Sequence, residues 1–316
     1  MTTLPTPLRG IVPPLVTPLS TPEQLDTRGL ERLVEHILGG GVSGLFLLGT
    51  TGEGPSLSVA LRRQVIDHVV DQVAERVPVL VGVTDTSLVE SIELAEYAAD
   101  AGASAVVLAG PPYFPIGGHD LREYVRRAAA AMPLPLFLYN MPSHTKLRFD
   151  VETVRMAVDL PQVAGIKDSS GDMVYFQQVI RTAAGRPDFA VFVGPEELLA
   201  QAVLYGGHGG VCGGANLDPA LFVDLYQAAV AGDLTRIAAL EAKVLQRAGA
   251  VYCFDASSAG VIKGIKAALE GLGICCGALA EPLHPLGLNE CELIGVELAE
   301  LASTIDIRQG DQSLIR

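Results

Sequence analysis

The sequence contains no tryptophan, five cysteines and five lysines among its 316 residues. The cysteines are odd in number and show no CxxC pair, and the six histidines show no paired metal-ligand spacing. We therefore expect no metal site and no cofactor, and a reduced, cytoplasmic protein.

Long apolar runs and positive net charge are also missing. The chain opens without a basic region followed by an apolar stretch, and no uninterrupted apolar run approaches the length of a membrane span. The formal net charge of −14 argues against nucleic acid or an anionic membrane as a partner. Small molecules are the partners that we expect.

Short apolar runs dominate what is present. Hydrophobic residues make up 49% of the chain, and Gly/Pro or polar punctuation separates the runs. Runs of this kind are typical of buried parallel strands. Eight strands are predicted, at Ile11–Pro18, Gly44–Thr50, Val79–Thr84, Ala105–Ala109, Leu134–Asn140, Val163–Asp168, Ala190–Gly194 and Gly209–Gly214.

Helical patterns alternate with these strands and continue beyond the last one. Eight strand–helix units favour an α/β fold, a (β/α)8 TIM barrel, and no GxGxxG follows the first strand. We expect residues 1–231 to form the barrel and residues 232–316 a helical C-terminal extension packed on it, with a frayed tail from Asp306. The predicted helices are Arg28–Leu38, Val59–Val73, Leu88–Ala101, Leu121–Ala131, Pro219–Ala231, Leu234–Ala248, Ser257–Leu272 and Glu290–Ser303.

In such a barrel the chemistry belongs at the carboxyl ends of the strands. Lys167 lies at the end of one apolar run and directly precedes a Ser/Gly turn. Burial disfavours the charged form of a lysine, and a neutral amine is the nucleophile that forms an imine with a carbonyl. The alternative is a lysine whose head group reaches solvent at the strand end.

Two further strand ends carry suitable groups. Residues 49–53 read Gly-Thr-Thr-Gly-Glu, a turn whose hydroxyls and successive N–H groups suit a carboxylate. The alternative is a tight turn whose threonines cap the next helix. Tyr139 ends the strand before that of Lys167, so its hydroxyl can handle protons beside the amine. Its alternative is a buried aromatic residue with a satisfied hydroxyl.

Together these segments resemble the dihydrodipicolinate synthase / N-acetylneuraminate lyase family of pyruvate-dependent class I aldolases. The resemblance covers nearly the whole chain, from about Gly10 onward. It rests on the Gly-Thr-Thr-Gly-Glu turn, on Tyr139-Asn140-Met141-Pro142 and on Gly165-Ile166-Lys167-Asp168-Ser169, in the order and spacing of the family.

The resemblance implies a role for each matching residue. Lys167 forms the imine, Tyr139 moves protons, and Gly49, Thr50 and Thr51 receive the carboxylate of the pyruvoyl group. Val211 lines the site beside the imine. Tyr113 is donated across a dimer interface and completes a proton relay with Thr50 and Tyr139, and a homotetramer of two such dimers is implied.

One departure concerns the second substrate. His144 occupies the position at which the lysine-pathway synthase carries an arginine that grips a carboxylate. Histidine cannot reproduce a bidentate guanidinium pair, so the departure argues against that activity. Arg148 and Lys146 are the nearby cations that have the charge to take its place.

The sequence thus predicts a lyase or aldolase that makes or cleaves the bond between a pyruvoyl unit and an aldehyde. A 2-keto-3-deoxy acid or a 4-hydroxy-2-oxoglutarate type of substrate fits. The alternatives are the lysine-pathway synthase itself, a 2-keto-acid dehydratase, a metal-dependent aldolase, and a regulatory barrel that only binds a ligand.

Overall fold

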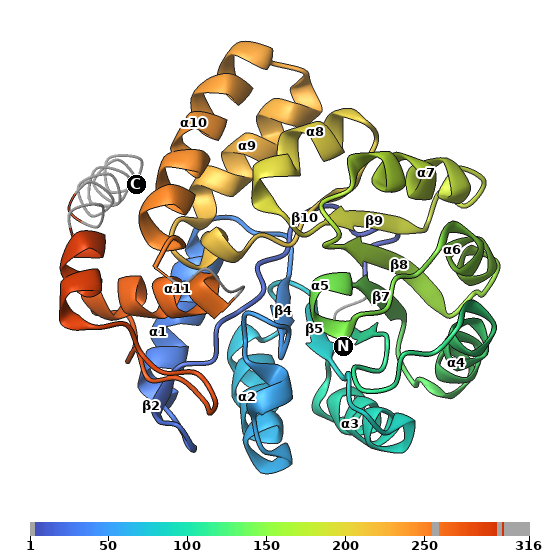
Figure 1. Cartoon of the computed structure of the whole chain (residues 1–316), viewed down its shortest axis with the longest axis horizontal. Coiled ribbons are helices and arrows are strands. Elements are labelled where there is room, and N and C mark those ends of the chain that lie inside the picture. Colours follow the sequence, from blue (N-terminus) through green and yellow to red (C-terminus); the bar gives the residue numbers. More distant parts are fainter. Residues whose placement is uncertain (1–3, 255–258, 296–298, 300–316) are drawn as a thin grey trace.

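Eight short parallel strands form a single curled sheet (Figure 1). The computed structural model describes residues 4–254, 259–295 and 299. The hydrogen-bonded order is β1-β10-β9-β8-β7-β6-β5-β4. A parallel bridge between Pro14 and Phe46 joins the chain after β1 to β4, and the Leu15 amide donates to the Phe46 carbonyl oxygen at 2.8 Å. The sheet therefore closes, which confirms the predicted (β/α)8 barrel.

Seven of the eight predicted strands contain an observed strand. The barrel strands are β1 (Gly10–Ile11), β4 (Leu45–Leu47), β5 (Val79–Gly82), β6 (Ala105–Ala109), β7 (Leu136–Asn140), β8 (Val163–Asp168), β9 (Ala190–Val193) and β10 (Gly209–Gly210).

The first predicted strand, Ile11–Pro18, is wrong in its extent. Pro13, Pro14 and Pro18 have no amide donor, so the regular ladder stops at Ile11. A small antiparallel hairpin of β2 (Leu19–Thr21) and β3 (Gln24–Leu25) follows, which the apolar pattern did not predict.

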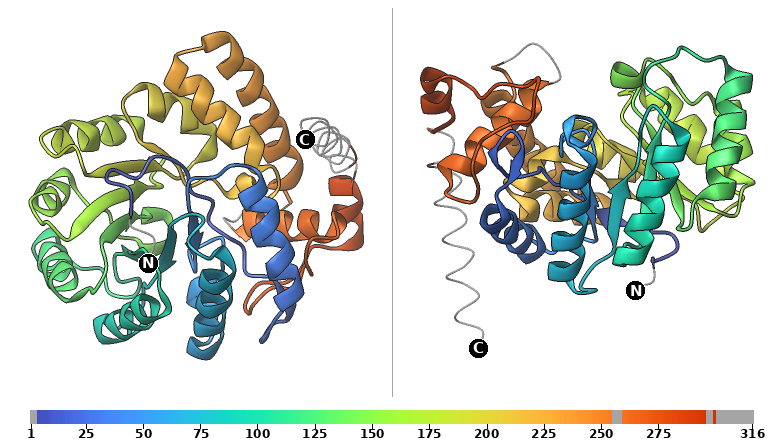
Figure 2. Two further views of the ribbon diagram at one scale, coloured as in Figure 1. Left: turned by 180° about the vertical axis from the view of Figure 1, so that it is seen from behind. Right: turned by 90° about the horizontal axis from the view of Figure 1, so that it is seen from below.

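Most helices surround the strands (Figures 1 and 2), whereas the short helix α5 lies over the barrel in Figure 1. They are α1 (Thr27–Gly39), α2 (Val59–Val73), α3 (Leu88–Ala101), α4 (Gly118–Ala131), α5 (Pro142–Thr145), α6 (Val151–Val158), α7 (Met173–Ala183), α8 (Leu199–Leu204), α9 (Pro219–Ala231), α10 (Leu234–Val251) and α11 (Ala259–Gly271), with short 3-10 turns η1 (Gly54–Ser56), η2 (Glu196–Leu198) and η3 (Gly213–Asn216). Side-chain caps fix several starts, for example Ser58 on α2 and Ser87 on α3. Gly102 ends α3 with a φ of 100°, as the Gly signals predict.

The core consists of two clusters because side chains alternate across each strand. On β4, Leu45 and Leu47 face the helices, whereas Phe46 faces the barrel interior. The interior cluster also holds Phe137, Tyr139 and Phe192. Tyr139 is thus one of the side chains that fill the barrel interior, at its carboxyl end.

The C-terminal extension packs beside the barrel (Figure 1). Helix α10 lies against α9, and α11 contacts both α10 and η3. The predicted helix 257–272 is helical from residue 259 to residue 271 and ends in a turn at residue 272, and the predicted helix 290–303 is helical at residues 290–295 and 299. Their other residues, like the predicted frayed tail, lie outside the described ones. The division at residue 231 stays a prediction. Among the described helices, none is both long and apolar enough to cross a membrane.

Candidate active site

Lys167 and Tyr139 lie side by side at the carboxyl end of the barrel. They are register partners on the adjacent strands β8 and β7. The Lys167 amine lies 4.1 Å from the ring centroid of Tyr139 and 5.1 Å from that of Phe46. Only 7% of Lys167 is exposed, so the alternative of a solvent-directed head group does not hold.

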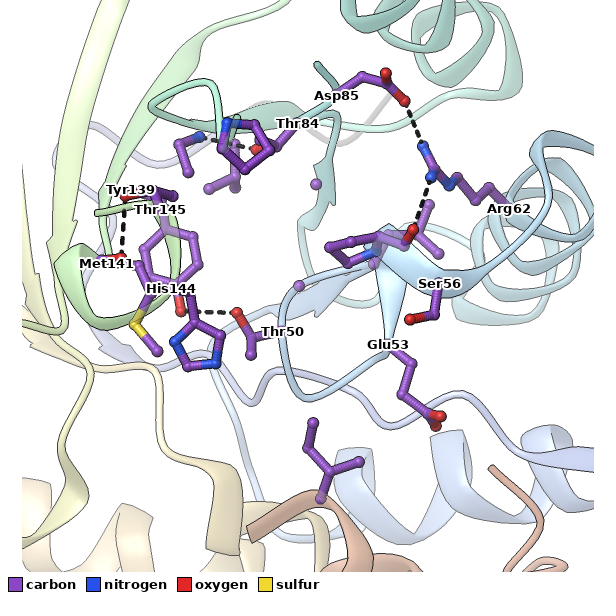
Figure 3. Close-up of a pocket in the computed structure, with 18 of the residues that line it drawn as sticks. Thr50, Glu53, Ser56, Arg62, Thr84, Asp85, Tyr139, Met141, His144 and Thr145 are labelled. Atoms are coloured by element: carbon purple, nitrogen blue, oxygen red, sulfur yellow. Dashed lines mark hydrogen bonds and ion pairs between the residues drawn. The ribbon is translucent and has the colours of Figure 1, made fainter. Parts of the chain in front are cut away.

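The Tyr139 hydroxyl contacts the catalytic turn, by which we mean residues 49–53. Its oxygen lies 3.2 Å from the Thr50 hydroxyl oxygen, as Figure 3 shows, and either group can donate. The Phe46 ring meets the Tyr139 ring edge-on at 6.3 Å and holds it in place. A hydroxyl pair therefore lies beside the buried amine.

The rest of the catalytic turn is tightly packed. Gly49 and Thr50 line a cavity of about 560 Å³, while Thr51 is half-buried and is not among the residues that line it. A β-carbon on Gly49 would lie 2.6 Å from the Phe46 ring, so only glycine fits there. Ser58 caps helix α2, which removes the alternative that the threonines do so.

Val211 lies directly after β10 and is buried. It and Lys167 line a small apolar space of about 10 Å³ inside the barrel, together with Phe46 and Phe192. The structure thus brings Val211 to the amine, as the resemblance implies for its position.

His144 lies on the short helix α5 and lines the larger cavity near Tyr139 (Figure 3). Partial burial, followed by the charges of Lys146 and Lys167, lowers the pKa of His144. Its Nδ1 lies 3.0 Å from the Ser143 hydroxyl oxygen. The histidine therefore lies at the cavity, on the same side as Tyr139.

Neither nearby cation takes the place of the missing arginine. Arg148 pairs with Asp172 at 2.8 Å and stacks over the Tyr175 ring. The Lys146 amine donates to the Ser143 carbonyl oxygen at 2.6 Å. Neither residue lines the cavity.

Tyr113 is the predicted residue that the structure does not bring to the others. Its side chain is 77% exposed and meets Phe114 in an edge-on pair at 5.1 Å. Pro112 lines the cavity but Tyr113 does not. Within one chain, the relay of Thr50, Tyr139 and Tyr113 is incomplete.

The sequence reasoning missed the opposite wall of the cavity. Arg62 and Asp85 form an ion pair at 3.1 Å there, and Ser56, Thr84 and Thr86 add hydroxyls (Figure 3). The extension contributes Ala259, Ile262 and Leu283. Thr84 ends a predicted strand and the next two residues follow it, so their place at a strand end was a signal that could have found them. Arg62 lies on α2, and helical periodicity does not say which loop that helix faces.

Two buried charged groups were also missed or misassigned. Glu53 of the catalytic turn forms an ion pair with Lys266 of α11, and neither side chain has exposed surface. Glu196 begins η2 and is buried. Its carboxylate accepts hydrogen bonds from the Gly214 amide at 2.7 Å and the Tyr252 hydroxyl at 2.8 Å. Its neighbour Glu197 is exposed.

No group of three or more His, Cys, Asp and Glu side chains within the described ranges could hold a metal ion. The described residues offer two hydroxyls and an imidazole around the larger cavity. The Lys167 amine lines the small apolar space, which shares Phe46 with that cavity.

Comparisons with known proteins agree with this geometry. The sequence model of the dihydrodipicolinate synthetase family matches residues 7–300. A probable 2-dehydro-3-deoxy-D-pentonate aldolase of Escherichia coli is 34% identical over 256 residues, which are 80% of this chain and 85% of that protein.

Two solved structures resemble the fold closely. The dihydrodipicolinate synthase of Bacteroides thetaiotaomicron has a TM-score of 0.90 and 47% identity, over 93% of this chain and 99% of that one. The Escherichia coli protein YagE, solved in complex with pyruvate, has a TM-score of 0.87 and 30% identity, over 93% and 98%. The chain belongs to the dihydrodipicolinate synthetase family, whose members include lyases and aldolases.

Proposed function

We propose that this protein is a class I aldolase that joins or splits a pyruvoyl unit and an aldehyde through an imine at Lys167. The observation that carries the proposal is the buried Lys167 amine beside the contact between the Tyr139 and Thr50 hydroxyls. The pyruvate complex of the related YagE supports it.

In the cleavage direction, the neutral Lys167 amine attacks C2 of the 2-oxo acid and forms a carbinolamine. Tyr139 protonates its hydroxyl, which leaves as water and gives an iminium ion. Loss of the proton from the C4 hydroxyl breaks the C3–C4 bond and releases the aldehyde, and the electron pair remains as an enamine. Protonation at C3 and hydrolysis release pyruvate and restore the amine.

The chain's residues support two parts of this scheme. The N–H groups and hydroxyls of the catalytic turn suit the substrate carboxylate. The Thr50 hydroxyl, 3.2 Å from that of Tyr139, gives the proton a path away from the imine.

The larger cavity suits a neutral, hydroxylated aldehyde as the second substrate better than an anionic one. The described cavity wall offers the hydroxyls of Ser56, Thr84 and Thr86, while the charge of Arg62 is balanced by Asp85. Arg148 is paired away from the cavity. The cleaved substrate would then be a 2-keto-3-deoxy acid, the class named for the pentonate aldolase relative.

Borohydride trapping tests the imine. With pyruvate present, mass spectrometry of the wild-type protein should find one reduced adduct on Lys167, Lys167→Arg should give none, and Lys146→Arg should react as the wild type does. An unmodified wild-type protein would refute the proposal and favour the ligand-binding alternative. The absence of a cofactor stays a prediction. Loss of activity on addition of a chelator would favour the metal-dependent aldolase.

A panel of aldehydes offered with pyruvate then distinguishes the substrates. We expect turnover with glyceraldehyde or glycolaldehyde to exceed that with glyoxylate or aspartate semialdehyde. Preference for aspartate semialdehyde would instead assign the lysine-pathway synthase. Release of water without an aldehyde from a 2-keto acid would assign the dehydratase.

We further propose that a neighbouring copy supplies Tyr113 and that the protein is a homotetramer. The support is the exposed Tyr113–Phe114 pair next to Pro112 on the cavity rim. Cytoplasmic location stays a prediction.

A further inference from the structure

A buried ion pair connects the catalytic turn to the C-terminal extension. Glu53 is the last residue of the turn, and Lys266 lies on α11. Neither side chain has exposed surface. The role assigned to the catalytic turn above uses neither residue.

Both charged groups also bind the main chain of one segment of the extension. The second carboxylate oxygen of Glu53 accepts from the Ala280 amide at 2.7 Å. The Lys266 amine donates to the Ala278 carbonyl oxygen at 2.6 Å. Residues 278–280 are therefore fixed to the turn by the ion pair and by these two hydrogen bonds.

Glu53 in turn shapes the segment that presents Thr50. Its amide donates to the Thr50 carbonyl oxygen at 3.0 Å. Its φ of 55° lies in the left-handed region, which a residue with a side chain adopts only when its surroundings impose it. Anchoring the Glu53 side chain is one way to impose that conformation. The Thr17 hydroxyl, which donates to the Gly52 carbonyl oxygen at 2.7 Å, is another.

The same helix supplies part of the cavity wall. Ile262 lines the cavity and lies one helical turn before Lys266, so both are on one face of α11. A shift of Lys266 therefore moves the cavity wall as well as the turn.

A gain in stability does not by itself account for such a pair. Removing two charges from water costs about as much as their attraction returns, so a buried pair adds little net stability. Its distinct physical effect is to fix two segments in one relative position.

We propose that Glu53 and Lys266 are positioning residues of the active site, which hold the Thr50 hydroxyl at its distance from Tyr139 through the fixed catalytic turn. The inference rests on the proposed function, because Thr50 and Tyr139 act there on a pyruvoyl substrate.

The test uses the full-length chain with Lys266→Met and with the double change Glu53→Gln and Lys266→Met. The double variant leaves no unpaired buried charge, so it folds even where the single variant does not. Pyruvate is titrated in the borohydride assay well below the melting temperature of every variant. We expect the half-saturating pyruvate concentration to rise about tenfold or more in both variants, because small misplacements weaken a preorganised site.

Arg186→Met is the matched control. Arg186 donates to the carbonyl oxygens of Val158 and Leu160, in the segment before β8 at the other end of the barrel. The Arg186→Met substitution should lower the melting temperature and leave the half-saturating pyruvate concentration unchanged.

The results separate the two proposals. A wild-type protein without an adduct would overturn the proposed function, and the positioning role with it. The positioning role alone would be overturned if the wild type forms the adduct and the double variant has the same half-saturating pyruvate concentration as the wild type.

Discussion

The Lys167 amine lies over the rings of Phe46 and Tyr139 in the barrel interior. Ring faces attract a cation, and the two rings also screen the amine from water. The residue was predictable from the sequence because a lysine at the end of an apolar run is unusual. Its neighbour Tyr139 was predictable as well, because it ends the preceding strand. Phe46 was not, since it comes from a strand far away in the chain.

Tyr139→Phe separates the hydroxyl from the packing of the ring. The ring contact with Phe46 should persist, and the contact with Thr50 is lost. We expect kcat to fall by roughly 10²- to 10⁴-fold, the usual contribution of a positioned proton donor. Steady-state kinetics with the best aldehyde checks this, and a kcat within about threefold of the wild type, a loss far below that range, would contradict it.

Glu196 gives the protein a stability that depends on pH. Burial raises the pKa of Glu196 to about 7 from an ordinary value of 4.5, against the opposing effects of the Gly214 amide and the Tyr252 hydroxyl. The folded protein then holds this proton more tightly than the unfolded chain. The stabilising contribution is present below pH 4.5 and is lost as the pH rises through about 7.

Glu196→Gln should remove this dependence. Between about pH 5 and about pH 8, the free energy of unfolding of the wild type should fall relative to the variant, by on the order of 3 kcal/mol at most. Urea unfolding at the two pH values measures the difference. The exposed neighbour provides the control, because Glu197→Gln should show no such change. If the free energy of unfolding differs between the wild type and Glu196→Gln by the same amount at both pH values, the assignment is contradicted.

At the scale of the element, the catalytic turn and the glycine that follows it are tightly packed. A β-carbon on Gly54, the residue that follows it, would lie 2.1 Å from the Leu48 carbonyl oxygen. Leu48 and Glu53 both have positive φ values, 58° and 55°. The motif predicted a ligand-binding turn, but its rigidity follows from contacts with the barrel and the extension.

Gly54→Ala should therefore destabilise the protein by about 1–3 kcal/mol, the usual cost of overpacking. Gly39→Ala is the control, because an added β-carbon at the end of α1 meets nothing within 4 Å. It should leave the stability unchanged or slightly raised, since alanine favours a helix. Denaturant unfolding of both variants checks this, and equal stabilities would refute the steric argument.

At the scale of the whole molecule, one chain holds an incomplete relay. If a neighbouring copy supplies Tyr113, inactive Lys167→Ala and impaired Tyr113→Phe proteins should restore activity when they are mixed and allowed to exchange subunits. The reason is that a mixed dimer contains one site with both residues intact. Native mass spectrometry should show a species of four 33.1 kDa chains. No restoration in mixtures with proven exchange would place Tyr113 outside the site.

The sequence by itself determined the barrel and the place of the proposed catalytic residues at its carboxyl end. Strand–helix alternation is a local signal, and parallel strands that close into a barrel bring their carboxyl ends together. Lys167, Tyr139 and Thr50 were predictable because each directly follows or ends an apolar run. The end of β1 was not predictable from the apolar run. Proline keeps such a run apolar, but it lacks the amide donor that a β-ladder needs.

Only the tertiary structure decided which distant residues support that centre. The pairing of Glu53 with Lys266, the Arg62–Asp85 ion pair, the burial of Glu196 and the cavity wall from α11 all depend on how helices far along the chain dock. Periodicity shows that a helix has a buried face, but docking angle and register decide what that face meets. The residues proposed to form and serve the imine are therefore set locally by strand ends, and the cavity wall proposed to meet the second substrate is set by packing.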